Sequence, residues 1–134
     1  MMLVVRETGA CSDVGQVRQS NEDALVLSDP VFAVADGMGG ARAGEVASAM
    51  AVAALHGLQG GEQPLAHAIE DVNLRIYTAA KNDPSLLGMG TTITAAMLDG
   101  DALVLGHVGD SRAYLFRSGR LQQLTDDHSL VGEL

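Results

Sequence analysis

Asp36 is the residue whose surroundings in this sequence most clearly indicate chemistry. It follows the apolar run over residues 31–35 and precedes three glycines, Gly37, Gly39 and Gly40. An ionised carboxylate at the end of a buried strand is costly unless a cation meets it. Glycines also let the backbone come close to a bound group. The pattern therefore predicts a metal ion held by oxygen ligands at Asp36.

Two further acidic segments lie next to predicted strands. One combines a guanidinium, Arg18, with the adjacent carboxylates Glu22 and Asp23. The other places Asp110 shortly after the apolar run over residues 102–108. Carboxylates are ligands that hard divalent cations prefer. Because the segments are far apart in sequence, only the fold could bring them together with Asp36.

The elements that would position these residues are predicted from apolar periodicity and turn residues. Period-two runs indicate strands, and apolar residues that recur every three or four positions indicate helices. We expect strands over residues 3–8, 24–27, 31–35, 91–98, 102–108, 112–117 and 120–124, and helices over residues 43–58 and 64–81. This order is typical of an α+β domain with antiparallel sheets. The first hairpin would carry Glu22, Asp23 and Asp36 at neighbouring strand ends.

Composition restricts the class of protein. The chain has 134 residues, 47% hydrophobic content and a formal net charge of −9, which fit one globular unit. Its single lysine, Lys81, leaves no cluster of positive charge for nucleic acid or an anionic membrane. The single cysteine, Cys11, excludes an internal disulfide framework, and we expect a cytoplasmic protein. No apolar run has the length of a membrane span or of a signal-peptide core.

Five segments, in order, resemble the bacterial branch of the metal-dependent protein phosphatases, the protein phosphatase 2C type. They are residues 18–24, 36–40 with 44–48, 88–92, 109–114 and 124–130. Each segment alone is a weak signal, but together they cover nearly the whole chain. The resemblance implies a four-layer α-β-β-α sandwich, in which helices flank two antiparallel sheets and the active site lies at one end.

The resemblance also implies an activity. Members of the family use two manganese or magnesium ions, which share a bridging water that attacks the phosphorus of phosphoserine or phosphothreonine directly. The implied partners are phosphorylated proteins, the substrates of eukaryotic-like bacterial serine/threonine kinases. Nucleic acid and a membrane are not expected as partners of this chain.

Roles in metal binding follow from the resemblance residue by residue. Asp36 matches the carboxylate that bridges both ions, and the carbonyl of Gly37 matches a ligand of one of them. Glu22 and Asp23 match residues that ligate that same ion or hold its waters. Asp110 matches the ligand of a third, weaker metal. Hard cations bound by oxygen ligands can activate water near neutral pH, so the implied chemistry agrees with the residue types.

Arg18 matches the residue that binds the substrate phosphate, and a planar guanidinium can hold two phosphate oxygens. The family completes its first metal with two further aspartates that this chain lacks. We therefore expect residues 1–134 to be the N-terminal part of a single catalytic domain whose C-terminal part is absent. The alternative is a catalytically inactive phosphatase-like domain that binds phosphoproteins.

Two other kinds of site fit the glycine and aspartate patterns poorly. The glycines after Asp36 begin like a dinucleotide-binding loop, but Arg42 stands at the third glycine position and the carboxylate would face a pyrophosphate. The aspartates within residues 99–110 lack the spacing and terminal glutamate of an EF-hand calcium loop. Arg112 is interpreted as a structural partner of nearby acids, not as a substrate ligand.

Overall fold

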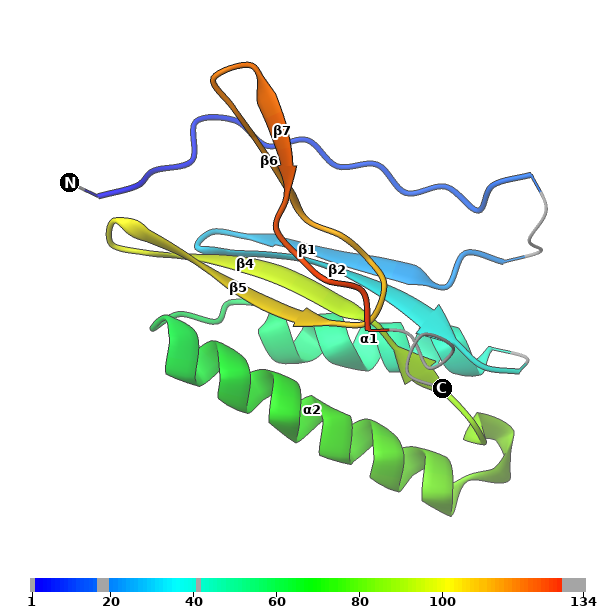
Figure 1. Ribbon diagram of the computed structural model, residues 1–134. Helices are drawn as coiled ribbons and strands as arrows, with labels where there is room; N and C mark the ends of the chain where they lie inside the picture. Colours follow the sequence, from blue (N-terminus) through cyan, green and yellow to red (C-terminus); the bar gives the residue numbers. More distant parts are fainter. Residues whose placement is uncertain (1, 17–19, 41, 129–134) are drawn as a thin grey trace.

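The computed structural model describes residues 2–16, 20–40 and 42–128. They contain a five-stranded antiparallel sheet, two helices and a separate hairpin (Figure 1). The strands are β1 (Asp23–Ser28), β2 (Val31–Met38), β3 (Gly90–Thr91), β4 (Ile93–Asp99), β5 (Ala102–Val108), β6 (Tyr114–Arg117) and β7 (Arg120–Gln123). The helices are α1 (Ala43–Leu55) and α2 (Glu62–Asn82), and a short 3-10 helix (Pro84–Leu86) precedes β3. The predicted α+β class with antiparallel sheets is confirmed.

The strand order β1-β2-β4-β5 makes β2 an interior strand. β1 and β2 form the predicted hairpin, in which Asp23 lies opposite Asp36. On its other side β2 pairs with β4, and its last two residues pair with β3. Asp36 therefore lies near the end of an interior strand and has backbone neighbours on both sides.

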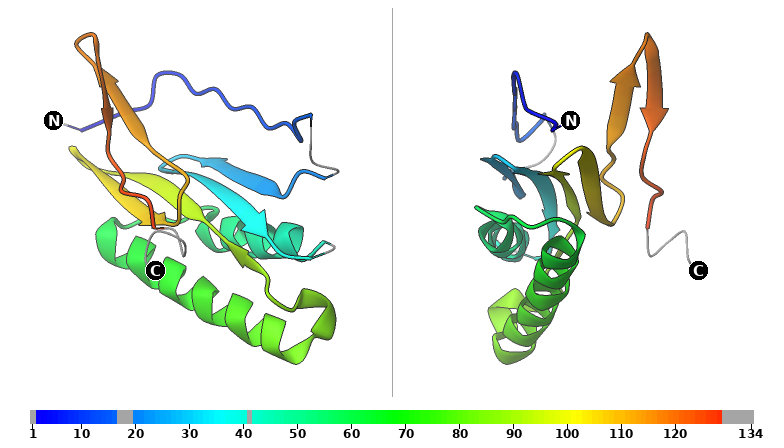
Figure 2. Two further views of the ribbon diagram at one scale, coloured as in Figure 1. Left: turned by 45° about the vertical axis from the view of Figure 1, so that its right-hand side comes forward. Right: turned by 90° about the vertical axis from the view of Figure 1, so that its left-hand side faces the viewer.

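Both helices lie on one face of the sheet (Figure 2). Small side chains let α1 come close to β1 and β2, and its buried residues are Ala43, Gly44, Ala47, Ser48, Ala51 and Leu55. α2 packs on α1 and β5, and it buries Leu65, Val72 and Ile76 from the stripe that the spacing predicts. Neither of these helices combines the length and apolar character that crossing a membrane would need.

The opposite face of the sheet has no helix over it in the described part of the chain. Leu25, Leu27 and Val34 lie on this face and are 39%, 50% and 48% exposed. Residues 2–16 run across it as an extended chain, and the β6–β7 hairpin projects away from it (Figure 1). The predicted strand over residues 3–8 is wrong. A strand needs a partner ladder along a sheet edge, whereas this segment crosses above the sheet.

The exposed apolar residues of this face should make the chain self-associate. We expect dimers and larger species to increase with protein concentration, because an open apolar sheet face gains free energy when another molecule covers it. Sedimentation velocity over a range of concentrations measures this. Leu27→Lys should reduce self-association, whereas Leu74→Lys, at an exposed position of α2, should not. A monodisperse monomer at every concentration would contradict the prediction.

Candidate metal centre

Two acidic side chains share one face of the sheet where β1 begins and β2 approaches its end. Asp23 is the first residue of β1 and lies directly opposite Asp36. Opposed residues of an antiparallel pair point to the same face, with Cβ atoms about 4.5–5.5 Å apart. Here it is the face of Leu25 and Val34, away from the helices. Gly37, the next residue of β2, is buried. The hairpin thus brings two carboxylates within reach of one cation.

Glu22 precedes β1 and contacts the beginning of α1. Its carbonyl oxygen accepts hydrogen bonds from the Gly37 amide (3.1 Å) and the Ser48 hydroxyl (2.7 Å). Its carboxylate lies against Gly44, where a Cβ atom would overlap Oε2. Within the described residues, Oε2 is buried and has no hydrogen-bond partner. A buried oxygen that lacks a hydrogen-bond partner lowers the free energy of unfolding by about 1–3 kcal/mol. A hard cation, or water bound to one, would remove that cost.

One cavity of about 200 Å³ connects these acidic residues. It is lined by Asp13, Val14, Ser20, Asn21, Glu22, Asp23 and Asp36. Side-chain oxygens predominate in this set, and oxygen ligands suit magnesium and manganese. Among the residues that the structure describes, no three His, Cys, Asp or Glu side chains converge closely enough to hold a metal ion. The carboxylates therefore surround a common space without forming a complete coordination shell.

Asp13 and Asn21 also line this cavity, although neither is among the candidate ligands that the sequence pattern indicates. The Asp13 carboxylate accepts a hydrogen bond from the Gly15 amide (2.8 Å), as in an ordinary Asx turn. The Asn21 side chain accepts from the Asp23 amide (3.0 Å) and donates to the Ser12 hydroxyl (2.7 Å). Local sequence marks both as turn residues. No signal in the sequence could have separated them from other turn residues.

Thr92 holds the backbone of Asp36 from the side opposite β1. The Asp36 amide donates to the Thr92 hydroxyl (2.9 Å), and the Thr92 amide donates to the Asp36 carbonyl oxygen (2.9 Å). The Thr92 hydroxyl also shares a hydrogen bond of 3.0 Å with the Ser111 hydroxyl. Thr92 is only 3% exposed, so solvent has little access to these groups. This residue therefore connects the end of β2 with the loop over residues 109–113.

Asp110 lies in that loop, which follows β5, and it does not line the cavity of the other acidic residues. Its neighbour Ser111 lines an adjoining cavity of about 170 Å³ together with Asp23 and Asp36. The fold thus places the loop of Asp110 beside the other candidate ligands, in an adjoining position outside their shared cavity. Arg18, the expected phosphate ligand, lies outside the described residues.

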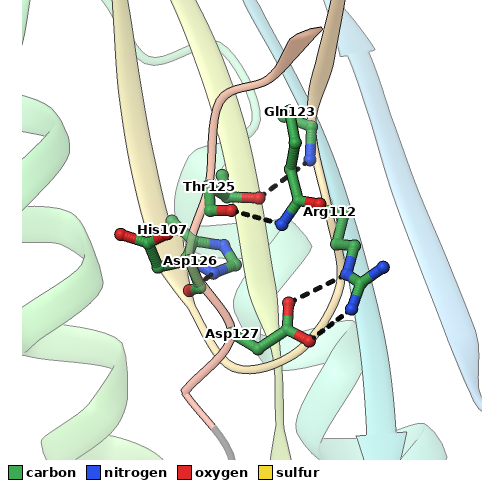
Figure 3. A network of polar contacts seen from close by, with 7 residues as sticks. His107, Arg112, Gln123, Thr125, Asp126 and Asp127 are labelled. Atoms are coloured by element: carbon green, nitrogen blue, oxygen red, sulfur yellow. Dashed lines mark hydrogen bonds and ion pairs between the residues drawn. The ribbon is translucent and has the colours of Figure 1, made fainter.

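A polar network joins the loop after β5 to the segment after β7 (Figure 3). The Arg112 guanidinium donates to both carboxylate oxygens of Asp127, at 2.9 and 2.7 Å. These hydrogen bonds hold the pKa of Asp127 below its usual value and raise the pKa of Arg112. One ring nitrogen of His107 makes a 3.0 Å hydrogen bond to the Asp126 carbonyl oxygen. Arg112 is therefore the partner of an acid, as the sequence analysis predicts.

Comparison with known proteins identifies close relatives. A family model described as protein phosphatase 2C matches residues 10–133. The serine/threonine protein phosphatase PstP of Mycobacterium tuberculosis is 43% identical, over 98% of this chain and 27% of PstP. The serine/threonine phosphatase stp of Listeria welshimeri is 43% identical, over 92% of this chain and 55% of stp. The chain thus spans about half of one relative and about a quarter of the other.

Solved structures agree with the sequence matches. A crystal structure of M. tuberculosis PstP superimposes with a TM-score of 0.84 at 43% identity and covers 92% of this chain and 55% of that one. A crystal structure of the PstP catalytic domain in complex with two manganese ions also gives a TM-score of 0.84 at 43% identity, covering 92% of this chain and 56% of that one. The sheet and its two helices are therefore similar to about half of a manganese-binding catalytic domain.

Proposed function

Because the chain belongs to the protein phosphatase 2C family, we propose that it supplies part of the active site of a metal-dependent serine/threonine protein phosphatase. One observation carries the proposal: Glu22, Asp23 and Asp36 line a single cavity at one end of the sheet. Residues 1–134 would be the N-terminal part of one catalytic domain. The sheet face with Leu27 and Val34 would then lie against a second sheet in an α-β-β-α sandwich.

Metal binding is supported by the donor set and by the buried oxygen of Glu22. Asp36 would bridge two manganese or magnesium ions, and the Gly37 carbonyl would ligate one of them. Glu22 and Asp23 would ligate that ion or hold its waters. Asp110 would bind a third, weaker ion from the adjoining loop. When bound, the ions would supply a water acidic enough to act as nucleophile near neutral pH and would neutralise phosphate charge.

The proposed reaction is hydrolysis of a phosphoserine or phosphothreonine side chain. An oxygen–phosphorus bond forms from water while the bond from phosphorus to the side-chain oxygen breaks, and the departing alkoxide takes up a proton. Arg18 would hold the phosphate of the substrate through two hydrogen bonds. The substrates would be cytoplasmic proteins phosphorylated by eukaryotic-like bacterial serine/threonine kinases.

The decisive experiment is manganese-dependent hydrolysis of a phosphothreonine peptide by the 134-residue chain. Phosphate release is measured with manganese, with magnesium, and with excess chelator. We expect weak release or none from this chain alone, because the two further aspartates of the family's first metal are not among residues 1–134. Any release should need manganese and stop with chelator.

The outcomes separate the two candidate activities. Hydrolysis would show that these residues suffice for catalysis, alone or as an assembly of copies. Manganese binding and phosphopeptide binding without hydrolysis would favour the phosphatase-like binding domain. That alternative is favoured by one observation, that no three His, Cys, Asp or Glu side chains of the described residues converge closely enough to hold a metal ion. Absence of manganese binding would contradict both.

A further inference from the structure

The loop that carries Asp110 precedes the β6–β7 hairpin. It is held in place mainly by the segment that follows the hairpin. The carbonyl oxygen of Gly109 accepts a hydrogen bond from the His128 amide (2.8 Å). The Ala113 amide donates to the Thr125 hydroxyl (3.1 Å), and the Ala113 carbonyl oxygen accepts from the Leu124 amide (2.8 Å). Residues 124–128 therefore run alongside the loop and contact it before and after Asp110.

Along each segment, Arg112 and Asp127 lie between the residues that make these backbone contacts. Their ion pair is drawn in Figure 3. Two parallel hydrogen bonds, from Nε to Oδ1 (2.9 Å) and from the terminal nitrogen to Oδ2 (2.7 Å), fix the direction of both side chains. By contrast, the ion pair of Arg75 with Asp71 joins residues of one helix. A pair that connects distant segments through two points can determine how those segments lie relative to each other.

His107 anchors the same segment to the sheet. Its Nε2 makes a hydrogen bond of 3.0 Å with the Asp126 carbonyl oxygen, and its Nδ1 makes one of 3.0 Å with the Thr94 hydroxyl of β4. Its ring also lies 5.4 Å from the ring of His128, measured between centroids. Residues 124–128, which include Asp127, are thus linked to β4 and β5 through His107. The sheet therefore limits the movement of the segment that holds Arg112.

We propose that Arg112 and Asp127 are positioning residues of the metal centre, and that their ion pair fixes the loop from which Asp110 would bind its ion. The inference rests on the proposed function, because the position of this loop affects metal binding only if Asp110 binds a metal. The side chains of Arg112 and Asp127 are 47% and 34% exposed. Exposed ion pairs contribute little to folding stability, so loss of the pair should change the loop more than the fold.

The test compares Arg112→Lys and Asp127→Asn with the unaltered chain. Lysine keeps the positive charge but cannot make two parallel hydrogen bonds, and asparagine keeps the shape of aspartate without its charge. Asp127→Glu serves as the conservative variant that can restore the pair. Arg75→Lys and Asp71→Asn are the matched controls, since their ion pair is also exposed and lies in α2.

Two measurements by nuclear magnetic resonance read out the effect. Without metal, amide hydrogen exchange at Ala113 and His128 should become about tenfold faster in Arg112→Lys and Asp127→Asn. With manganese, the affinity of the Asp110 site, followed by signal broadening in the loop, should fall about tenfold, as for residues that orient a ligand without touching the ion. Affinity at Asp36 should stay within about twofold, and Asp127→Glu should recover much of the loss.

The double variant Arg112→Lys/Asp127→Asn tests whether the two residues act as a pair. If they do, it should be no worse than the more affected single variant. Unchanged exchange at Ala113 and His128, additive effects, or unfolding of both single variants would each overturn the inference. If the unaltered chain shows no manganese effect at Asp110, the third ion of the proposed function fails. The metal-free exchange data then still decide whether the ion pair holds the loop.

Discussion

Asp36→Asn should reduce manganese affinity by about 100-fold or more. Residues that merely orient a metal ligand typically change affinity by 10–100-fold when mutated, so loss of a carboxylate that contacts the ion should reach or exceed the upper end. Asparagine keeps the size of the side chain and the backbone hydrogen bonds to Thr92. The fold should therefore persist while one of the negative charges that line the cavity is lost.

Thermal stability gives this prediction a second readout. A cation that binds only the folded chain raises its melting temperature. Manganese should therefore raise the melting temperature of the unaltered chain, and Asp36→Asn should remove most of that increase.

The matched control is Asp101→Asn. Asp101 is exposed in the turn between β4 and β5, and the pairing of Val31 with Met97 places that turn at the opposite end of the sheet from Asp36. Isothermal titration with manganese, run on both variants and the unaltered chain, measures the difference. Equal affinity in Asp36→Asn and Asp101→Asn would mean that Asp36 does not bind the metal.

Thr92→Val should destabilise the chain by about 1–3 kcal/mol and also weaken manganese binding. Valine has nearly the shape of threonine but no hydroxyl, so the Asp36 amide would lose its acceptor in a place that is almost closed to solvent. The cost of a buried donor left without a partner falls in that range. The link from Thr92 to Ser111 would be lost as well.

Thr92→Ser separates the hydroxyl from the methyl group. Serine keeps the hydroxyl that accepts from the Asp36 amide but lacks the methyl group of threonine. That methyl group lies close to Gly109, because a Cβ atom built on Gly109 would be 2.6 Å from it. Manganese affinity should therefore recover in Thr92→Ser even if some stability does not. Urea unfolding measures stability, and titration measures affinity. If both variants lose affinity equally, the hydroxyl is not what positions Asp36.

The hairpin of β1 and β2 shows which parts of the site local sequence could specify. Two apolar runs joined by a turn predicted the pairing, and the pairing fixed Asp23 opposite Asp36 because side chains alternate along strands. The helices were predicted for a similar reason, since the apolar stripe of α2 and the alanine-rich α1 are properties of neighbouring residues.

Local sequence failed where a structure depends on partners. Residues 3–8 have the apolar character of a strand, but whether they pair depends on an edge being available beside them. Asp13 has the pattern of a turn residue, and only the path of residues 2–16 brings it to the cavity with Glu22. In the same way, the buried state of Glu22 Oε2 depends on Gly44, which lies in another element.

The sequence by itself determined the family, the α+β class, most helices and strands, and the acidic residues that a metal would need. These follow from residue types and short spacings, which act within one turn or one hairpin. Only the tertiary structure decided that Thr92 holds Asp36, that Arg112 binds Asp127, and that Asp110 lies apart from the main cavity. Those contacts join segments 15 or more residues apart, and their geometry is set by packing of the whole sheet, which no local pattern encodes.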